Sequence, residues 1–68
     1  MMKKFCGHKV KILLLEKEIT QTQFASLINI TPQYLSNILK EKKSPSEKLL
    51  NRMAQVLGVR KESLQILK

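Results

Sequence analysis

The segment Thr20–Lys40 reads TQTQFASLINITPQYLSNILK and carries the signals of two short helices separated by a turn. Thr20 and Gln23 have the spacing of a capping box, in which the Thr20 hydroxyl accepts the Gln23 backbone N–H and the Gln23 side chain reaches back. The side chains predicted to face inward are Phe24, Ala25 and Ile28. Asn29 ends this helix, because asparagine tolerates the left-handed conformation that a tight turn needs.

The second helix of the segment is predicted over Thr31–Lys40. Thr31 is its N-cap, and Pro32 takes the first helical position, where its missing N–H costs nothing. A rotation of about 100° per residue separates an apolar side from a polar side. The apolar side consists of Leu35, Ile38 and Leu39, and the polar side of Gln33, Ser36, Asn37 and Lys40. Two short helices joined in this way, with a polar outer face on the second, predict a helix-turn-helix.

Three further helices are predicted around this motif. The first covers Gly7–Lys17, the next begins at a second capping box in which Ser44 is the cap and Pro45 the first residue, and the last covers Lys61–Leu67. The residues expected to face inward are Val10, Leu13, Leu14, Leu50, Met53, Ala54, Leu57, Leu64 and Leu67, with Ile30 as a buried plug in the turn. The chain is therefore predicted to be one all-α domain over residues 1–68. We expect a compact bundle of five short helices, with a loose segment at residues 1–6.

The net charge limits the classes of partner. Thirteen Lys and Arg residues against five acidic residues give a formal charge of +8, which attracts nucleic acids or anionic membrane surfaces. The apolar run Ile12–Leu15 is too short for a secretory signal or a membrane span, and the lysines do not gather opposite one apolar stripe. No Asp or Glu lies between Ile19 and Lys40, which is typical of a surface that approaches a polyanion. We therefore expect no membrane contact and a cytoplasmic, nucleoid-associated protein.

Several other function classes lack the residues they need. Cys6 is the only cysteine and His8 the only histidine, so the sequence predicts neither an intrachain disulfide nor a zinc site. It contains no set of nucleophile, base and orienting group, no glycine-rich phosphate loop and no pair of carboxylates on one helix face. We expect no enzyme activity, no cofactor, no metal and no small-molecule ligand.

At these residues the chain resembles the lambda-repressor-like family, which comprises Cro, phage-repressor and other XRE-type helix-turn-helix domains. The resemblance extends over Val10–Leu64. Its specific parts are Ile19–Ala25 (ITQTQFA), Asn29–Thr31 (NIT), Ser44–Pro45 (SP) and Ala54–Val59 (AQVLGV). Several spaced elements in the right order make the match more specific than any one of them.

Three positions depart from the family pattern. Asn29 stands where the family usually has a glycine in the turn, and Glu41 stands where it often has a glycine after the second helix of the motif. Leu14 and Leu39 occupy positions at which many members pair an arginine with an acid. We therefore expect an apolar contact between these two residues in place of the ion pair.

The resemblance implies roles for individual side chains on DNA. The positions that face bases are Pro32, Gln33, Ser36 and Asn37, and those placed for phosphates are Gln21, Thr31, Tyr34, Lys40, Lys42 and Lys43. Gln33 and Asn37 can each offer a donor and an acceptor to adenine, which is worth about 1–3 kcal/mol of discrimination per contact. Phosphate contacts fix orientation without reading sequence.

These roles imply a sequence-specific, repressor-like transcriptional regulator that reads the major groove of double-stranded DNA with the helix Thr31–Lys40. We expect a homodimer on a palindromic operator, with half-sites about 34 Å apart. Its apolar dimer surface is expected in the last two helices and the C-terminal end, although Ile12 or Leu15 is also placed to pair two copies. The alternative is a protein-interaction module, such as an antitoxin or a partner subunit, that keeps the fold without reading DNA.

Overall fold

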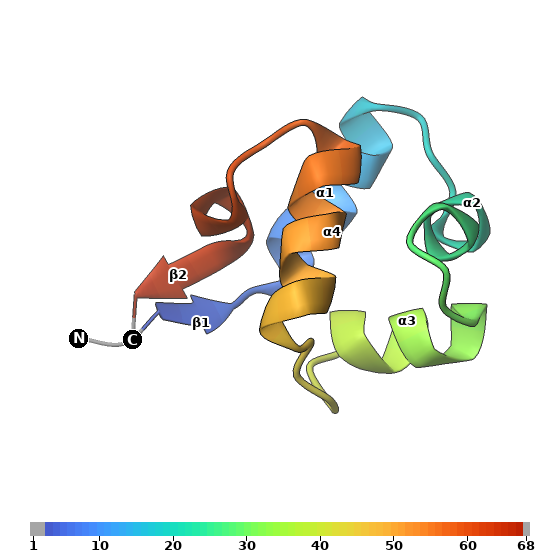
Figure 1. Ribbon diagram of the computed structural model, residues 1–68. Helices are drawn as coiled ribbons and strands as arrows, with labels where there is room; N and C mark the ends of the chain where they lie inside the picture. The colour runs from blue at the N-terminus through green and yellow to red at the C-terminus, as the bar shows by residue number, and fades with distance from the viewer. Residues whose placement is uncertain (1–2, 68) are drawn as a thin grey trace.

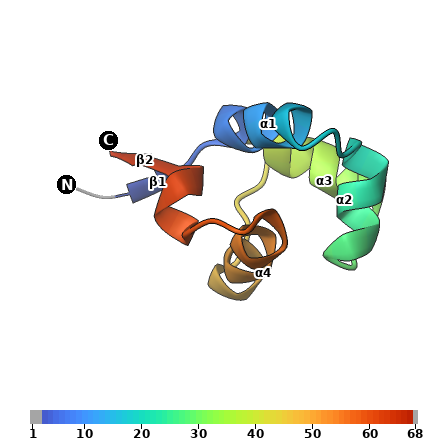
Figure 2. The same cartoon turned by 90° about the horizontal axis from the view of Figure 1, so that it is seen from above.

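The computed structural model describes residues 3–67, which form four α-helices, one short 3-10 helix and two short strands. In chain order these are β1 (Lys3–Phe5), α1 (Gly7–Glu16), α2 (Gln21–Leu27), α3 (Pro32–Leu39), α4 (Glu47–Leu57), η1 (Lys61–Leu64) and β2 (Gln65–Leu67). The strands lie at one end of the molecule and α2 with α3 at the other, while α1 and α4 lie between them on opposite edges (Figures 1 and 2). Within these residues the fold is mostly helical with a small sheet, which corrects the prediction of five helices.

One apolar core connects the four α-helices and η1. Its buried members are Val10, Leu14, Phe24, Ala25, Ile28, Leu35, Ile38, Leu39, Leu49, Leu50, Met53, Ala54, Leu57 and Leu64. Leu14 and Leu39 both belong to it, so apolar packing occupies the place of the family's ion pair. Leu13 and Ile30, which were also predicted to face inward, are half-buried and pack against this core.

The helix-turn-helix forms as its local signals predict. The Thr20 hydroxyl accepts the Gln23 N–H at 3.0 Å, and the Gln23 side chain accepts the Thr20 N–H at 2.9 Å, which completes the capping box. Asn29 has a φ of 62°, in the left-handed region. The Thr31 hydroxyl accepts the Tyr34 N–H at 3.1 Å and so caps α3, whose first residue is a proline. The turn therefore brings α2 and α3 into direct contact.

The start of α4 differs from the prediction. The N-cap is Ser46, whose hydroxyl accepts the Leu49 N–H at 3.1 Å, and Glu47 is the first helical residue. Pro45 therefore lies outside the helix, and Ser44 does not cap it. The motif S-P-S-E contains two serines that can serve as caps, and the one adjacent to the helix serves here.

Ser46→Ala is expected to lower the free energy of unfolding by about 1 kcal/mol, because it removes the oxygen that satisfies a free N–H of α4. The matched control is Ser44→Ala, which removes the same hydroxyl from an exposed position before the helix. Urea unfolding followed by circular dichroism measures both. A larger loss from Ser44→Ala than from Ser46→Ala contradicts this assignment of the cap.

Both ends of the described chain are extended rather than loose or helical. β1 and β2 pair antiparallel, with Lys4 opposite Ile66, and the Cys6 N–H donates to the Leu64 carbonyl at 2.8 Å. Leu64 is buried as predicted, but Leu67 is 60% exposed. The predictions of a helix up to Leu67 and of a loose segment are therefore wrong for the residues described. The expectation for residues 1 and 2 lies outside them.

Candidate nucleic-acid interface

The outer face of α3 presents the four side chains that were predicted to face bases. Pro32 and Gln33 are exposed, and Ser36 and Asn37 are half-buried. The opposite side of the helix is held in the core by Leu35, Ile38 and Leu39. Because a buried stripe fixes the rotation of a helix about its own axis, the polar face is presented in one orientation.

The two amides on this face are available for ligands. Gln33 and Asn37 stand four residues apart, which places them on one side of the helix. Within residues 3–67, no hydrogen bond engages the side-chain amide of either residue, so their donors and acceptors stay free. An amide of this kind can form two hydrogen bonds with the edge of an adenine in the major groove.

The residues predicted to contact phosphates are all on the surface. Gln21 is the first residue of α2, and the predicted contacts Thr31, Tyr34, Lys40, Lys42 and Lys43 are all exposed. Tyr34 lines a surface hollow of about 310 Å³ together with Lys48 and Arg52. Sequence reasoning assigned Lys48 no role beyond solubility, because its place beside Tyr34 depends on how α4 packs against the helix-turn-helix.

Arg52 has a structural contact beside this hollow. Its guanidinium donates to the Ile28 carbonyl at 3.2 Å, where α2 ends. The last carbonyls of a helix lack partners within the helix, so a cation is favourable there. Arg52 therefore holds α4 against the helix-turn-helix.

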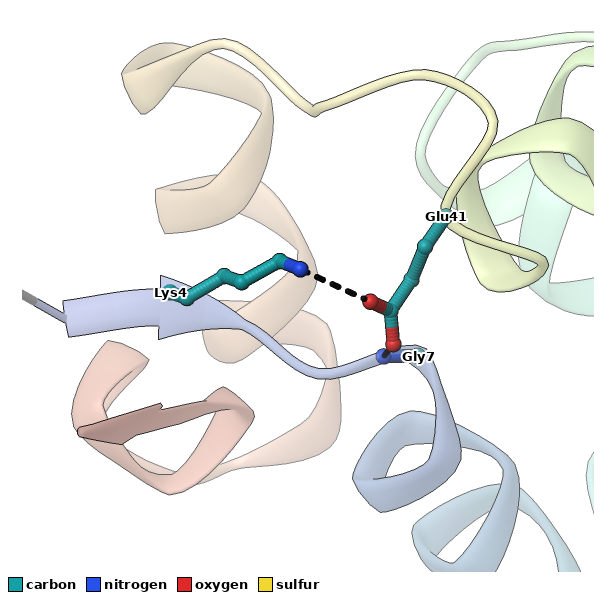
Figure 3. Close-up of polar contacts among 3 residues, drawn as sticks. All are labelled: Lys4, Gly7 and Glu41. Carbon is teal, nitrogen blue, oxygen red and sulfur yellow. Dashed lines mark hydrogen bonds and ion pairs between the residues drawn. The ribbon is translucent and has the colours of Figure 1, made fainter. Parts of the chain in front are cut away.

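Glu41 follows α3, and its carboxylate points toward Gly7 and Lys4 (Figure 3). One carboxylate oxygen accepts the backbone N–H of Gly7 at 3.3 Å, and the other lies 3.6 Å from the Lys4 ammonium. Cys6, the N-cap of α1, makes no side-chain hydrogen bond to the helix, so Glu41 supplies that partner from a distant part of the chain. The negative charge is thereby held at the positive end of α1.

The backbone of Glu41 explains this direction. Its φ is 62°, so the residue adopts the left-handed conformation that the family's glycine takes easily. The Lys42 N–H donates to the Asn37 carbonyl at 2.9 Å, which folds the basic loop back onto the end of α3. Sequence reasoning did not find the link from Glu41 to Gly7. The one signal for it was a charged residue at a glycine position.

Charge is distributed unevenly along the motif. No acid occurs between Ile19 and Lys40, and Glu41, the first acid after that stretch, is bound to Gly7 and Lys4. The outer side of α3 and the loop Lys40–Lys43 therefore combine amides and ammonium groups. Over residues 3–67, no His, Cys, Asp and Glu side chains cluster as metal ligands, and no helix is long and apolar enough to cross a membrane.

Comparisons with known proteins agree with this geometry. The immunity repressor protein of Bacillus phage phi105 is 32% identical over 53 residues, which make up 78% of this chain and 37% of the repressor. The chain thus spans little more than a third of the length of that relative.

Two solved structures share the fold. ClgR, the clp gene regulator of C. glutamicum, superimposes with a TM-score of 0.77 at 24% identity over 85% of this chain and 75% of that one. Cobalt(II) HppE, crystallised in complex with substrate, superimposes with a TM-score of 0.79 at 23% identity over 88% of this chain and 34% of that one. At these identities the likeness concerns the fold alone.

A family profile described as helix-turn-helix matches residues 10–64, which is most of the chain and includes every helix from α2 to η1. The matched region contains the capped pair α2–α3 and the buried side chains that orient it. The chain belongs to the XRE-type helix-turn-helix family.

Proposed function

We propose that this chain is a sequence-specific DNA-binding transcriptional regulator of the repressor type. The observation that carries the proposal is the outer face of α3, where the free amides of Gln33 and Asn37 lie on a helix anchored by a buried stripe. A rigid helix of this kind fits the major groove, whose base edges offer a distinct pattern of donors and acceptors for each base pair. The name of the phage relative, an immunity repressor, supports regulation in this sense.

The proposed mode of binding is a homodimer on a palindrome. Pro32, Gln33, Ser36 and Asn37 read bases, while Gln21, Thr31, Tyr34, Lys40, Lys42 and Lys43 contact phosphates. One α3 helix reads only a few base pairs, so two copies with half-sites about 34 Å apart are needed for a useful site length. Acting on DNA, the protein works in the cytoplasm at the nucleoid.

Selection of preferred sequences from a random pool of double-stranded DNA at physiological salt tests the proposal. We expect an enriched palindrome with two half-sites one helical turn apart. Specific binding is expected to exceed binding to unrelated DNA by about 10³-fold or more. If the pool shows no enrichment while the protein stays folded, the proposal is wrong and the protein-interaction module is favoured instead.

Lys42→Ala is expected to weaken binding by a similar factor on every DNA sequence, because an ammonium on a phosphate carries no base information. The slope of log affinity against log salt is expected to flatten by about one unit, since one fewer counterion is released. Fluorescence anisotropy over a salt series, on the selected site and on an unrelated duplex, measures both effects.

The matched control is Arg60→Ala, which removes one positive charge from the exposed connection between α4 and η1, on the side away from α3 in Figure 1. This variant is expected to leave the salt slope unchanged. A loss at Lys42 that depends on the DNA sequence shows instead that this lysine reads a base.

A further inference from the structure

The solvent side of α1 carries apolar side chains that no other part of residues 3–67 covers. Leu15 is 79% exposed and Ile12 is 42% exposed, although Val10 and Leu14 of the same helix are buried. Ile12 and Leu15 are three residues apart, so they are neighbours on the helix surface. This pair is defined here as the α1 seam.

The other surface expected for dimerisation, in the last two helices and at the C-terminal end, exposes few large apolar side chains within residues 3–67. The large apolar side chains of α4 and η1 are buried in the core and cannot form a dimer surface; Leu50, Leu57 and Leu64 are examples. At the C-terminal end of the described chain only Leu67 is a strongly exposed large apolar residue. The α1 seam is therefore the better candidate for contact with a second copy.

The charges beside the α1 seam are complementary in one orientation. Lys11 precedes Ile12 and Glu16 follows Leu15, so Ile12, Leu15 and Glu16 occupy positions a, d and e of a heptad, and Lys11 is position g of the preceding one. Isoleucine at a with leucine at d favours two parallel helices, in which g of one helix meets e of the other. Neither Lys11 nor Glu16 forms an ion pair within the described residues, so both are free for this contact.

The parallel orientation also suits one DNA duplex. The N-terminal end of α1 lies against the C-terminal end of α3, where a Cβ added to Gly7 would be 2.1 Å from the Leu39 carbonyl oxygen. In a parallel pair of α1 helices, both α3 helices therefore lie at the same end of the pair. An antiparallel pair would place them at opposite ends.

We infer that a second copy of this chain docks along α1 in parallel, with seam against seam and Lys11 of each copy beside Glu16 of the other. The inference rests on the proposed function, because it specifies how two copies come together on one operator. A helix of ten residues is about 15 Å long, so the contact is smaller than a stable interface of about 1,200–2,000 Å². Pairing is therefore weak in free solution and is strengthened when both copies occupy adjacent half-sites.

Reversal of the charges tests this arrangement with the full chain. K11E chains carry two carboxylates at the paired positions and E16K chains carry two ammonium groups, so each variant repels itself. Cooperativity is measured as the affinity for the selected palindrome relative to a single half-site, a ratio that cancels the change in net charge. We expect each variant to lose about tenfold in cooperativity, since two attractive contacts become repulsive.

An equimolar mixture of K11E and E16K is expected to restore cooperativity, because every contact between unlike chains is again attractive. The double variant K11E/E16K is expected to restore it within one chain. Sedimentation equilibrium of the same samples at high concentration without DNA reports the pairing independently of any DNA contact. Lys11, Ile12, Leu15 and Glu16 are all exposed, and circular dichroism confirms that each variant is folded.

Two results overturn the inference. In the first, the wild-type protein binds the palindrome cooperatively and neither K11E nor E16K changes this cooperativity. The dimer contact then lies on another surface. The second is wild-type protein that shows no cooperativity on the palindrome and no pairing in sedimentation. If the protein still prefers the half-site sequence over unrelated DNA in either case, the inference fails and the proposed function stands. If the chains pair in sedimentation but prefer no DNA sequence, only the proposed function fails.

Discussion

Gly7→Ala is expected to lower the free energy of unfolding by about 3 kcal/mol, the upper part of the range for an overpacked site. The added Cβ would lie 2.1 Å from the Leu39 carbonyl oxygen and 2.7 Å from the carbonyl carbon. Both atoms belong to the backbone, so no rotation of a side chain relieves the overlap, and α1 must move away from α3. That shift also stretches the hydrogen bond from the Gly7 N–H to Glu41.

This loss is large for so small a domain. The stability of a native domain is about 5–15 kcal/mol, and a chain of 68 residues belongs near the lower limit. Urea unfolding followed by circular dichroism measures the change. Because the overlap lies between α1 and α3, binding to the selected DNA is also expected to weaken under conditions where the variant is still folded.

The control is Gly58→Ala at the C-terminal end of α4. Gly58 has a φ of 69°, but an added Cβ would meet no atom within 4 Å. Only the left-handed backbone opposes the substitution there, at a cost of about 1 kcal/mol. If Gly7→Ala costs no more than Gly58→Ala, the close approach of α1 to α3 is refuted.

Gln33→Ala and Asn37→Ala are expected to reduce discrimination between the selected DNA site and its single-base variants. A bidentate contact to one base is worth about 2 kcal/mol, so each variant loses roughly 30-fold at the base pair that its amide contacts. The effect is confined to that base pair, because the buried stripe of α3 still holds the rest of the face in place. Competition binding against duplexes changed at one position at a time measures it.

The matched control for the amides is Gln55→Ala, which removes the same group from an exposed position on α4. It is expected to leave both discrimination and stability unchanged. Unaltered discrimination in both Gln33→Ala and Asn37→Ala, with the fold intact, removes the basis for placing α3 in the major groove.

The local parts of the fold followed from neighbouring residues. The capping box at Thr20, the left-handed turn at Asn29 and the cap at Thr31 each involve partners within about four positions, so their energetics depend little on the rest of the chain. The same holds for the inner side of α3, where the helical period alone separates buried from exposed residues. These elements contain the face that is proposed to read DNA.

One error was local, the choice of Ser44 instead of Ser46 as the cap of α4, and the others arose where distant segments meet. The segment after η1 is extended because β1, more than 60 positions earlier in the chain by the pairing of Lys3 with Leu67, offers backbone partners to β2. That contact cannot be read from the residues around Leu67, whose pattern also suits a helix.

Local signals in the sequence were thus sufficient for the helix-turn-helix, the direction of its polar face and the family, because caps and helical periods act over a few residues. The paired strands at the ends and the bond from Glu41 to Gly7 depended on the folded chain. Each of these contacts joins residues that are far apart in the chain. Tertiary packing decides which distant residues meet, and local propensity does not.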